Sequence, residues 1–339
     1  MECSYGGLGL DTNAIDCIFM QSIVSREIGM VGADRSVFPA GGGIIGRIDD
    51  VTPAVLRAMS GTEDKRLREL LDALVRHAHA FAREARLTEQ EFEFGIEFLN
   101  CIGKATHASH NEGVLFADAI GLSTLVCILN NGNAGATETA SALLGPFWRA
   151  NSPRTEDGGS IVRSPTPGPE LFVDCVIVDT TGKPIEGVEV DVWQSSPIGL
   201  YENQDETQAD MNLRGKFTTD RRGQFKFRSV KPAGYPVPTD GPVGDMLRAQ
   251  SRHPYRPAHM HFLGFKPGFK TLITQIFVDD DQYLESDVVF GVTRALVGNY
   301  RRHDDGTPPA GGVRAPWYTL THRFVMEPGE AILPKPPIA

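Results

Sequence analysis

Proline is distributed unevenly along this chain of 339 residues, and its distribution limits the fold that each part can adopt. Only Pro39, Pro53 and Pro146 precede residue 147, and the rest of the 23 prolines follow it. Because proline breaks helix interiors and marks turns, we expect a helical first part and a turn-rich second part. The sequence therefore predicts an α+β protein, in which an N-terminal helical region packs on a C-terminal antiparallel β-sandwich.

The apolar residues of the first part recur at helical spacing and predict three helices. The first helix is expected within residues 63–86, where leucines recur three or four positions apart. Thr88 and Glu91 have the spacing of a capping box, which predicts the start of the second helix. The third helix is expected from Glu112 to about Asn130, with a loop at residues 131–135.

The second part shows the period of two that is typical of strands. Val188, Val190 and Val192 alternate with Glu189, Asp191 and Trp193, which predicts a strand. Residues 220–223 have the composition of a hairpin turn, and residues 259–265 predict a further strand. Short strands separated by glycine and proline favour the sandwich.

Four residues of the second part have the donor types of a metal site. His259 and His261 are one residue apart, so on a strand both side chains point to the same face. Any one of the four residues by itself is more often an ordinary core residue, and His-x-His also occurs in zinc enzymes. Tyr201 and Tyr235 add phenolate oxygen, a hard anionic donor that suits a ferric ion. The combination therefore predicts a non-haem Fe(III) site.

Several longer stretches resemble the intradiol ring-cleaving dioxygenases, a family of ferric enzymes that act on catechols. The similarity extends from about residue 50 to about residue 325. The matching stretches are residues 144–148 (LGPFW), 179–187 (DTTGKPIEG), 191–194 (DVWQ), 199–201 (GLY), 214–217 (RGKF), 235–244 (YPVPTDGPVG) and 256–262 (RPAHMHF).

The resemblance assigns roles to individual residues. It implies that Fe(III) is bound by Tyr235 and His261 as axial ligands and by Tyr201 and His259 as equatorial ligands. Arg256, three residues before the first of these histidines, matches the catalytic arginine of the family. Gln275 matches a glutamine beside the substrate. Tyr235 is also implied in catalysis, because it can leave the metal and take a proton from the substrate.

Three stretches resemble the hydroxyquinol (1,2,4-trihydroxybenzene) enzymes within the family. They are residues 115–118 (LFAD), residues 135–138 (GATE) followed by 143–147 (LLGPF), and residues 283–292 (YLESDVVFGV). The resemblance implies that the substrate contacts Leu115, Asp118, Leu144, Gly145, Pro146 and Phe147. The predicted reaction is cleavage of hydroxyquinol by O2 to a hydroxymuconate or maleylacetate.

Other substrates and functions stay open. The resemblance associates hydroxyquinol enzymes with His as well as Gln at the position of Gln275, so catechol and chlorocatechol are alternative substrates that would give cis,cis-muconates. A β-sandwich module that binds an aromatic or lipid ligand without catalysis is an alternative of another class. A zinc hydrolase is the third alternative, and it would need a further His or carboxylate ligand.

Composition and resemblance together suggest the organisation of the chain. We expect an extension of unknown role in residues 1–50, a helical region for dimerisation and substrate covering in residues 51–145, and the catalytic sandwich in residues 146–339. The resemblance implies a homodimer joined through the N-terminal helices, and it allows a phospholipid bound at that interface.

The net charge and the cysteines limit the cellular setting. A formal charge of -10 opposes nucleic acid as a partner, and the longest apolar run is too short to span a bilayer. The five cysteines are widely spread without a CxxC pair, which favours a reduced, cytoplasmic protein.

Overall fold

The structure is a computed structural model that describes residues 43–107, 110–131 and 138–337. The chain divides into two compact units, Met1–Glu97 and Phe98–Ala339. Most of the extension predicted at residues 1–50 lies outside the described residues. So do most of the loop predicted at residues 131–135 and residues 135–137 of one hydroxyquinol-like stretch.

The first unit is helical, as predicted. Its elements are the 3-10 turns η2 (Ile48–Asp50) and η3 (Met59–Gly61), the helices α2 (Val51–Ala58) and α3 (Lys65–Ala85), and the first half of α4 (Glu89–Ala105). Helix α3 begins at Asp64, whose side chain accepts a hydrogen bond from the backbone N–H of Leu67 at 2.9 Å. The capping box that begins α4 is confirmed, because the backbone N–H of Thr88 donates to Glu91 at 2.9 Å and the N–H of Glu91 donates back to the Thr88 hydroxyl at 3.3 Å.

The prediction of one long third helix is wrong. Residues 112–131 form two helices, α5 (Glu112–Ala119) and α6 (Leu122–Asn131), whose axes meet at 79°. The break lies at Gly121, which has a φ of +74°, and the Phe290 ring is only 3.3 Å from where a Cβ atom at this position would lie. A left-handed glycine ends the helix, and a side chain at this position would be strained by its φ and would contact the Phe290 ring closely.

We searched the described residues for helices that could span a membrane. No single helix there is both long and apolar enough to cross a membrane. The sharply bent pair α5 and α6 would be long and apolar enough when taken together, by length and composition alone.

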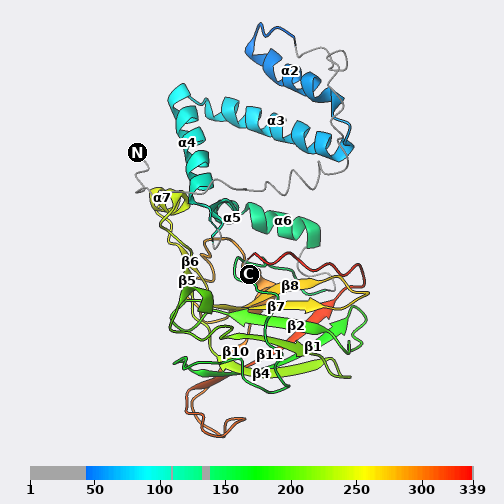
Figure 1. Cartoon of the computed structure of the whole chain (residues 1–339), viewed down its shortest axis with the longest axis vertical. Helices are drawn as coiled ribbons and strands as arrows, with labels where there is room; N and C mark the ends of the chain where they lie inside the picture. Colours follow the sequence, from blue (N-terminus) through cyan, green and yellow to red (C-terminus); the bar gives the residue numbers. More distant parts are fainter. Residues whose placement is uncertain (1–42, 108–109, 132–137, 338–339) are drawn as a thin grey trace. The chain divides into compact units, whose positions relative to one another are not determined.

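The second unit contains the predicted sandwich (Figure 1). One sheet has the strand order β10-β11-β1-β4, the other has the order β3-β2-β7-β8-β9, and β5 and β6 form a separate ribbon. The strands are β1 (Glu170–Asp179), β2 (Glu189–Gln194), β3 (Arg214–Thr218), β4 (Gln224–Val230), β5 (Tyr235–Pro236), β6 (Tyr255–Arg256), β7 (His259–Phe265), β8 (Leu272–Val278), β9 (Val297–Gly298), β10 (Tyr300–His303) and β11 (Trp317–Met326). Helix α7 (Pro242–Ala249) and the 3-10 turns η4 (Glu202–Gln204) and η5 (Arg294–Leu296) lie between strands. The pairs β1–β11 and β8–β9 are parallel, so both sheets are mixed rather than wholly antiparallel.

Residues 220–223 form the expected turn but not a hairpin. The N–H of Gly223 donates to the carbonyl of Asp220 at 2.9 Å, yet the flanking strands β3 and β4 belong to different sheets. The turn is a corner between the two layers, because Phe217 and Phe225 on either side of it both enter the core between the sheets.

The strand predicted at Val188–Val192 is present as β2, and both faces of the central strands are buried. In β2, Val190 and Val192 enter the sandwich core, while Trp193 is buried on the opposite face. In β7, Met260 and Phe262 enter the core, and His259 and His261, which alternate with them, face the other way. The outer face of this sheet is therefore also buried, and α5 and α6 lie on this side of the sandwich (Figure 1).

Candidate functional site

Strand register brings distant residues into two rows. On the outer face of the second sheet, His261 of β7 is paired with Trp193 of β2 on one side and with Gln275 of β8 on the other. In the β5–β6 ribbon, Tyr235 is paired with Arg256. Directly opposed residues on one face of a sheet lie within side-chain reach, so the register alone assembles much of the site.

The four predicted metal ligands lie together and are buried. The Nε2 atoms of His259 and His261 are 3.1 Å apart, and the hydroxyl oxygens of Tyr201 and Tyr235 are 3.5 Å apart. The rings of Tyr235 and His259 have centroids separated by 5.5 Å. All four polar tips thus converge on one small region.

The protonation state of the cluster suits a cation. His259 donates its Nδ1 proton to the carbonyl oxygen of Pro257 at 2.7 Å, which leaves the lone pair on Nε2. Burial lowers the pKa of both histidines well below the usual range, helped by Arg256 at His259 and by the neighbouring ring at His261. Burial also raises the pKa of Tyr201 well above its usual range, with Tyr235 adding to the effect. Two neutral imidazoles and two phenols that release protons on binding fit a hard, highly charged ion.

The described residues do not offer a conventional zinc site. No group of three or more His, Cys, Asp or Glu side chains among them is arranged to hold a metal ion. The zinc hydrolase alternative needs such a third ligand beside the two histidines, so the geometry disfavours it.

A buried ionic network supports Tyr201. The Phe147 ring stacks on Tyr201 with centroids 4.3 Å apart, and the Phe147 carbonyl accepts a hydrogen bond from Nη1 of Arg214 at 2.5 Å. Nε of Arg214 also donates to Glu202 at 2.6 Å. Because the arginine and the carboxylate are both buried and paired, they fix the backbone on each side of the tyrosine.

His261 is held between an aromatic ring and a backbone segment. The Trp193 indole stacks on it with centroids 4.6 Å apart and planes at 10°. On another side lies Gly145, whose φ of +75° requires glycine, and a Cβ atom there would be 3.2 Å from the imidazole Cε1. The predicted substrate contacts Gly145 and Phe147 therefore lie at the cluster. Leu144 packs beside it as well, whereas Pro146 is exposed.

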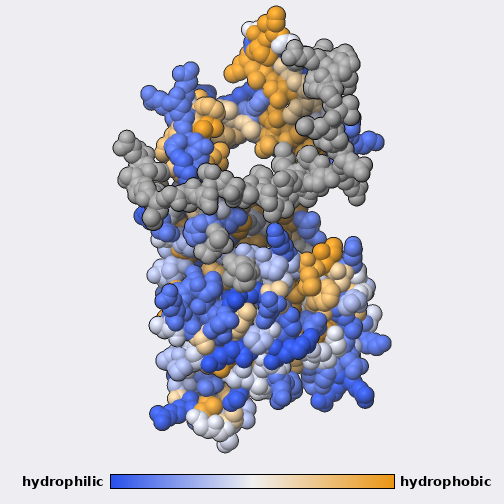
Figure 2. Space-filling model, viewed as in Figure 1, coloured by the Kyte–Doolittle hydropathy of each residue, from blue (hydrophilic) through white to orange (hydrophobic). Residues whose placement is uncertain are grey.

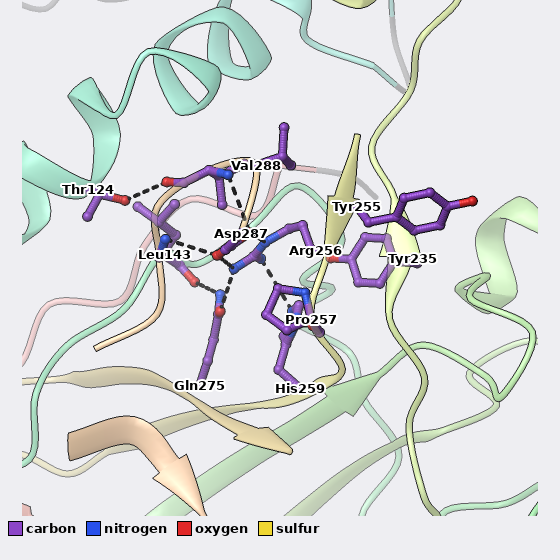
Figure 3. A network of polar contacts seen from close by, with 12 residues as sticks. Thr124, Leu143, Tyr235, Tyr255, Arg256, Pro257, His259, Gln275, Asp287 and Val288 are labelled. Atoms are coloured by element: carbon purple, nitrogen blue, oxygen red, sulfur yellow. Dashed lines mark hydrogen bonds and ion pairs between the residues drawn. The ribbon is translucent and has the colours of Figure 1, made fainter. Parts of the chain in front are cut away.

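Arg256 is buried beside Tyr235 and His259, two residues of the cluster (Figure 3). Its Nη1 atom is 3.3 Å from Nε2 of His259, and its Nη2 atom donates to Oε1 of Gln275 at 3.0 Å. Gln275 in turn donates from Nε2 to the carbonyl of Leu143 at 2.6 Å. The remaining edge of the guanidinium group is bound by Asp287. The arginine and glutamine predicted from the sequence are thus brought together at one side of the cluster.

Leu115 and Asp118 of α5 also belong to this region. Leu115 is buried among Val237, Val288 and Val289. Burial raises the pKa of Asp118, while a hydrogen bond from Ser123 and the charge of Arg256 act in the opposite direction. Asp118 is thus partly buried and paired with Ser123, and it lies on the helix that also carries the buried Leu115.

Three residues of the site had no assigned role from sequence. Trp193 and Arg214 lie in stretches that resemble the dioxygenase family, and Asp287 lies in the hydroxyquinol-like stretch 283–292. The resemblance of these stretches to the family was the sequence signal that could have identified the three residues. Three other histidines are hydrogen-bonded to hydroxyl groups, His79 to Thr52, His253 to Ser286 and His303 to Thr319.

The chain matches known proteins over most of its length. Residues 143–327 match the family described as Dioxygenase, and residues 64–138 match the family described as Catechol dioxygenase N terminus. The chain is 40% identical over 256 residues to catechol 1,2-dioxygenase of Candida albicans, across 75% of this chain and 84% of that protein. It is 39% identical over 276 residues to hydroxyquinol 1,2-dioxygenase of a Rhizobium species, across 80% and 92%. The solved structure of hydroxyquinol 1,2-dioxygenase from Pseudomonas putida superposes with a TM-score of 0.78 at 35% identity, covering 83% of this chain and 99% of that one.

Proposed function

The chain belongs to the family of intradiol ring-cleaving dioxygenases, and we propose on this premise that its substrate is hydroxyquinol. It is an enzyme rather than a non-catalytic binding module. The relatives named above act on catechol or on hydroxyquinol at nearly equal identity, so identity does not choose between the two substrates. The choice rests on residues that would surround the ring.

The proposed cofactor is one ferric ion per chain, held by Tyr201, Tyr235, His259 and His261. The support for this ion is the donor set itself, two neutral imidazole nitrogens and two phenol oxygens whose tips converge. When bound, Fe(III) withdraws electron density from a catecholate chelated through both oxygens and makes the ring reactive toward O2. Both oxygen atoms enter the product, so no external reductant is required.

The residues of the chain would move protons and stabilise charge. Tyr235, in the short β5–β6 ribbon, would accept a proton at its hydroxyl oxygen as the diol loses its two protons. Arg256 would direct its Nη1 edge toward the ring and stabilise the negative charge that develops there, because a guanidinium group remains cationic at any working pH. Burial of the cluster excludes water, which strengthens these interactions.

Asp118 is the single observation that favours hydroxyquinol over catechol. It lies on α5 one turn after Leu115, which packs against Val288 and Val289 in the loop that follows Asp287, so the helix adjoins the loop that holds Arg256. Hydroxyquinol has a third hydroxyl group that can donate a hydrogen bond to the Asp118 carboxylate, and catechol does not. Leu115, one helical turn before Asp118, would contact the ring face, because residues three apart share one side of a helix.

A substrate panel under O2 tests both parts of the proposal. Hydroxyquinol should give the highest kcat/KM, with hydroxymuconate or maleylacetate as product, and catechol should give a muconate. A yellow semialdehyde from catechol would contradict intradiol cleavage. A clear preference for catechol or chlorocatechol with poor turnover of hydroxyquinol would replace the proposed substrate with the alternative.

We also propose that the protein is a homodimer joined through its N-terminal helices. The support is a row of exposed apolar side chains on α3, formed by Leu70, Leu74 and Phe81, of which Leu74 is 63% exposed. Figure 2 shows apolar side chains gathered over the unit that contains α2 and α3. Leu74→Glu should shift sedimentation from dimer to monomer, whereas a monomeric wild type would exclude the dimer.

A phospholipid at the interface would be detected by mass spectrometry of an organic extract.

A further inference from the structure

Asp287 binds the guanidinium group of Arg256 on two atoms. Its Oδ1 atom accepts from Nε of the arginine at 3.2 Å, and its Oδ2 atom accepts from Nη2 at 3.2 Å (Figure 3). Both side chains are buried, with Asp287 only 5% exposed. A two-atom contact with a planar guanidinium group fixes its plane and its rotation, which a contact at a single atom does not.

The carboxylate of Asp287 is itself held in place by its own loop. Oδ1 accepts a hydrogen bond from the N–H of Val289 at 3.3 Å, and Oδ2 accepts one from the N–H of Gly291 at 2.9 Å. A Cβ atom on Gly291 would lie 3.0 Å from Nη2 of Arg256, so the loop backbone passes close to the ion pair. The loop therefore presents the carboxylate in one orientation.

The same contacts determine which edge of Arg256 faces the cluster. Asp287 occupies Nε and Nη2, and Gln275 shares Nη2, so the Nη1 edge is directed toward His259. The polar contacts of Asp287 are with the arginine and with backbone amides rather than with the proposed ligands. We propose that Asp287 is a positioning residue, which acts on the reaction only by aiming Arg256 at the bound ring.

The loop also connects this ion pair to the helices that carry Asp118. The Thr124 hydroxyl of α6 donates to the carbonyl of Val289 at 3.0 Å. Arg252 donates to the carbonyls of Ala119 and Val288, both at 2.7 Å. The loop that carries Asp287 is therefore hydrogen-bonded to α6 and linked through Arg252 to α5. Asp287 and Asp118 are thus held by the same set of contacts.

A double-mutant cycle separates positioning from general structural support. This inference rests on the proposed ring cleavage, and the variants are Asp287→Asn, Asp287→Ala, Arg256→Ala and the double variants, each loaded with iron. Asp287 also lines a cavity of about 460 Å³, from which water can fill the space left by truncation, and Asp287→Asn keeps the shape of the side chain, so two variants of different size test the same contact. Either single substitution of Asp287 should lower kcat by about 10- to 100-fold, as expected when a reacting group is misplaced by about 1 Å.

Non-additivity is the expected signature. In the Arg256→Ala background, replacing Asp287 should change kcat by less than about twofold, because its effect passes through the missing arginine. Iron content and the visible absorption band of the single variants should equal those of the wild type. The positioning role would be overturned if the loss of kcat in the double variant equalled the product of the two single losses. Loss of iron from Asp287→Asn would also overturn it.

Asp281 provides a matched control in the same segment. Its carboxylate accepts from the backbone N–H groups of Ala258 and Tyr283 at 3.0 and 2.8 Å, so it is held by backbone amides rather than by a guanidinium group. Any loss from Asp281→Asn should therefore multiply with the loss from Arg256→Ala. If the wild type cleaves neither hydroxyquinol nor catechol, the proposed function fails. If turnover is normal but the Asp287 losses multiply, only the positioning role fails.

Discussion

Arg256 is the residue to which we assign most of the charge stabilisation in the reaction. Its Nη1 edge lies 3.3 Å from His259, and its other donors are occupied by Gln275 and Asp287. Arg256→Ala should lower kcat by about 10²–10³-fold, the usual loss when one preorganised stabilising group is removed. The iron content should change little. Steady-state kinetics together with metal analysis checks both, and near-native turnover at full iron content would rule the role out.

We assign to Asp118 the selectivity for hydroxyquinol over catechol. A hydrogen bond to a charged group contributes about 1.5–3 kcal/mol, or about ten- to a hundredfold in selectivity. Asp118→Ala should therefore lower kcat/KM for hydroxyquinol by about that factor, while the value for catechol holds or rises. Asp118→Asn is the matched variant, because it keeps the shape and removes the charge. Equal losses on both substrates would mean that Asp118 is structural.

The segment before the first strand, which carries Gly145, forms part of the wall around His261. Gly145→Ala places a residue with a side chain at a φ of +75° and a Cβ atom 3.2 Å from the imidazole. Gly158 has nearly the same φ, +76°, but has open space around it, so Gly158→Ala is the control. Both variants should lose about 1–2 kcal/mol in the free energy of unfolding. Only Gly145→Ala should also weaken iron retention, measured by competition with a chelator, and equal iron retention in both would contradict the contact.

Sequence periodicity could predict the elements but not how they are paired. The two histidines of β7 share a face because strand side chains alternate, and this needed only local spacing. The stacking of Trp193 on His261 and the contact of Arg256 with Asp287 depend on register and loop paths between residues far apart in the chain. The break at Gly121 was missed for the same reason, since the Phe290 ring that occupies the space comes from a distant loop.

Acid sensitivity is a property of the whole fold to which His322 of β11 contributes. Burial lowers its pKa to about 4, so it is neutral in the folded protein, whereas in the unfolded chain it binds a proton below about pH 6.5. The free energy of unfolding should therefore fall as the pH decreases from 6.5 to 4, and this residue should account for at most about 3 kcal/mol of the fall. Above pH 6.5 its contribution is constant.

His322→Gln tests this contribution because it removes the titrating group. Denaturant unfolding of wild type and variant should be compared at pH 7 and pH 4.5. The variant should lose less stability than the wild type between the two pH values. An equal loss in both proteins would show that His322 does not sense pH in the folded state.

In the molecule as a whole, the β-sandwich forms a rigid scaffold, and the proposed site lies on the outer face of one sheet rather than in the core. The two sheets bury one continuous apolar core between them, and the outer face of the second sheet carries the histidines. The general architecture and the family could be predicted from proline distribution and motifs. The support of the site could not, because it is built from ion pairs such as Arg214 with Glu202 that no local pattern reveals.

The visible absorption spectrum of the iron-loaded protein, recorded for the wild type and for Tyr201→Phe, tests the central claim most directly. Charge transfer from tyrosinate to Fe(III) should make the wild type red to purple at one iron per chain. Tyr201→Phe should bleach much of this band and abolish turnover, because it removes one of the two phenolates. A colourless protein with stoichiometric zinc, or a band unchanged in the variant, would contradict the proposed ligand set.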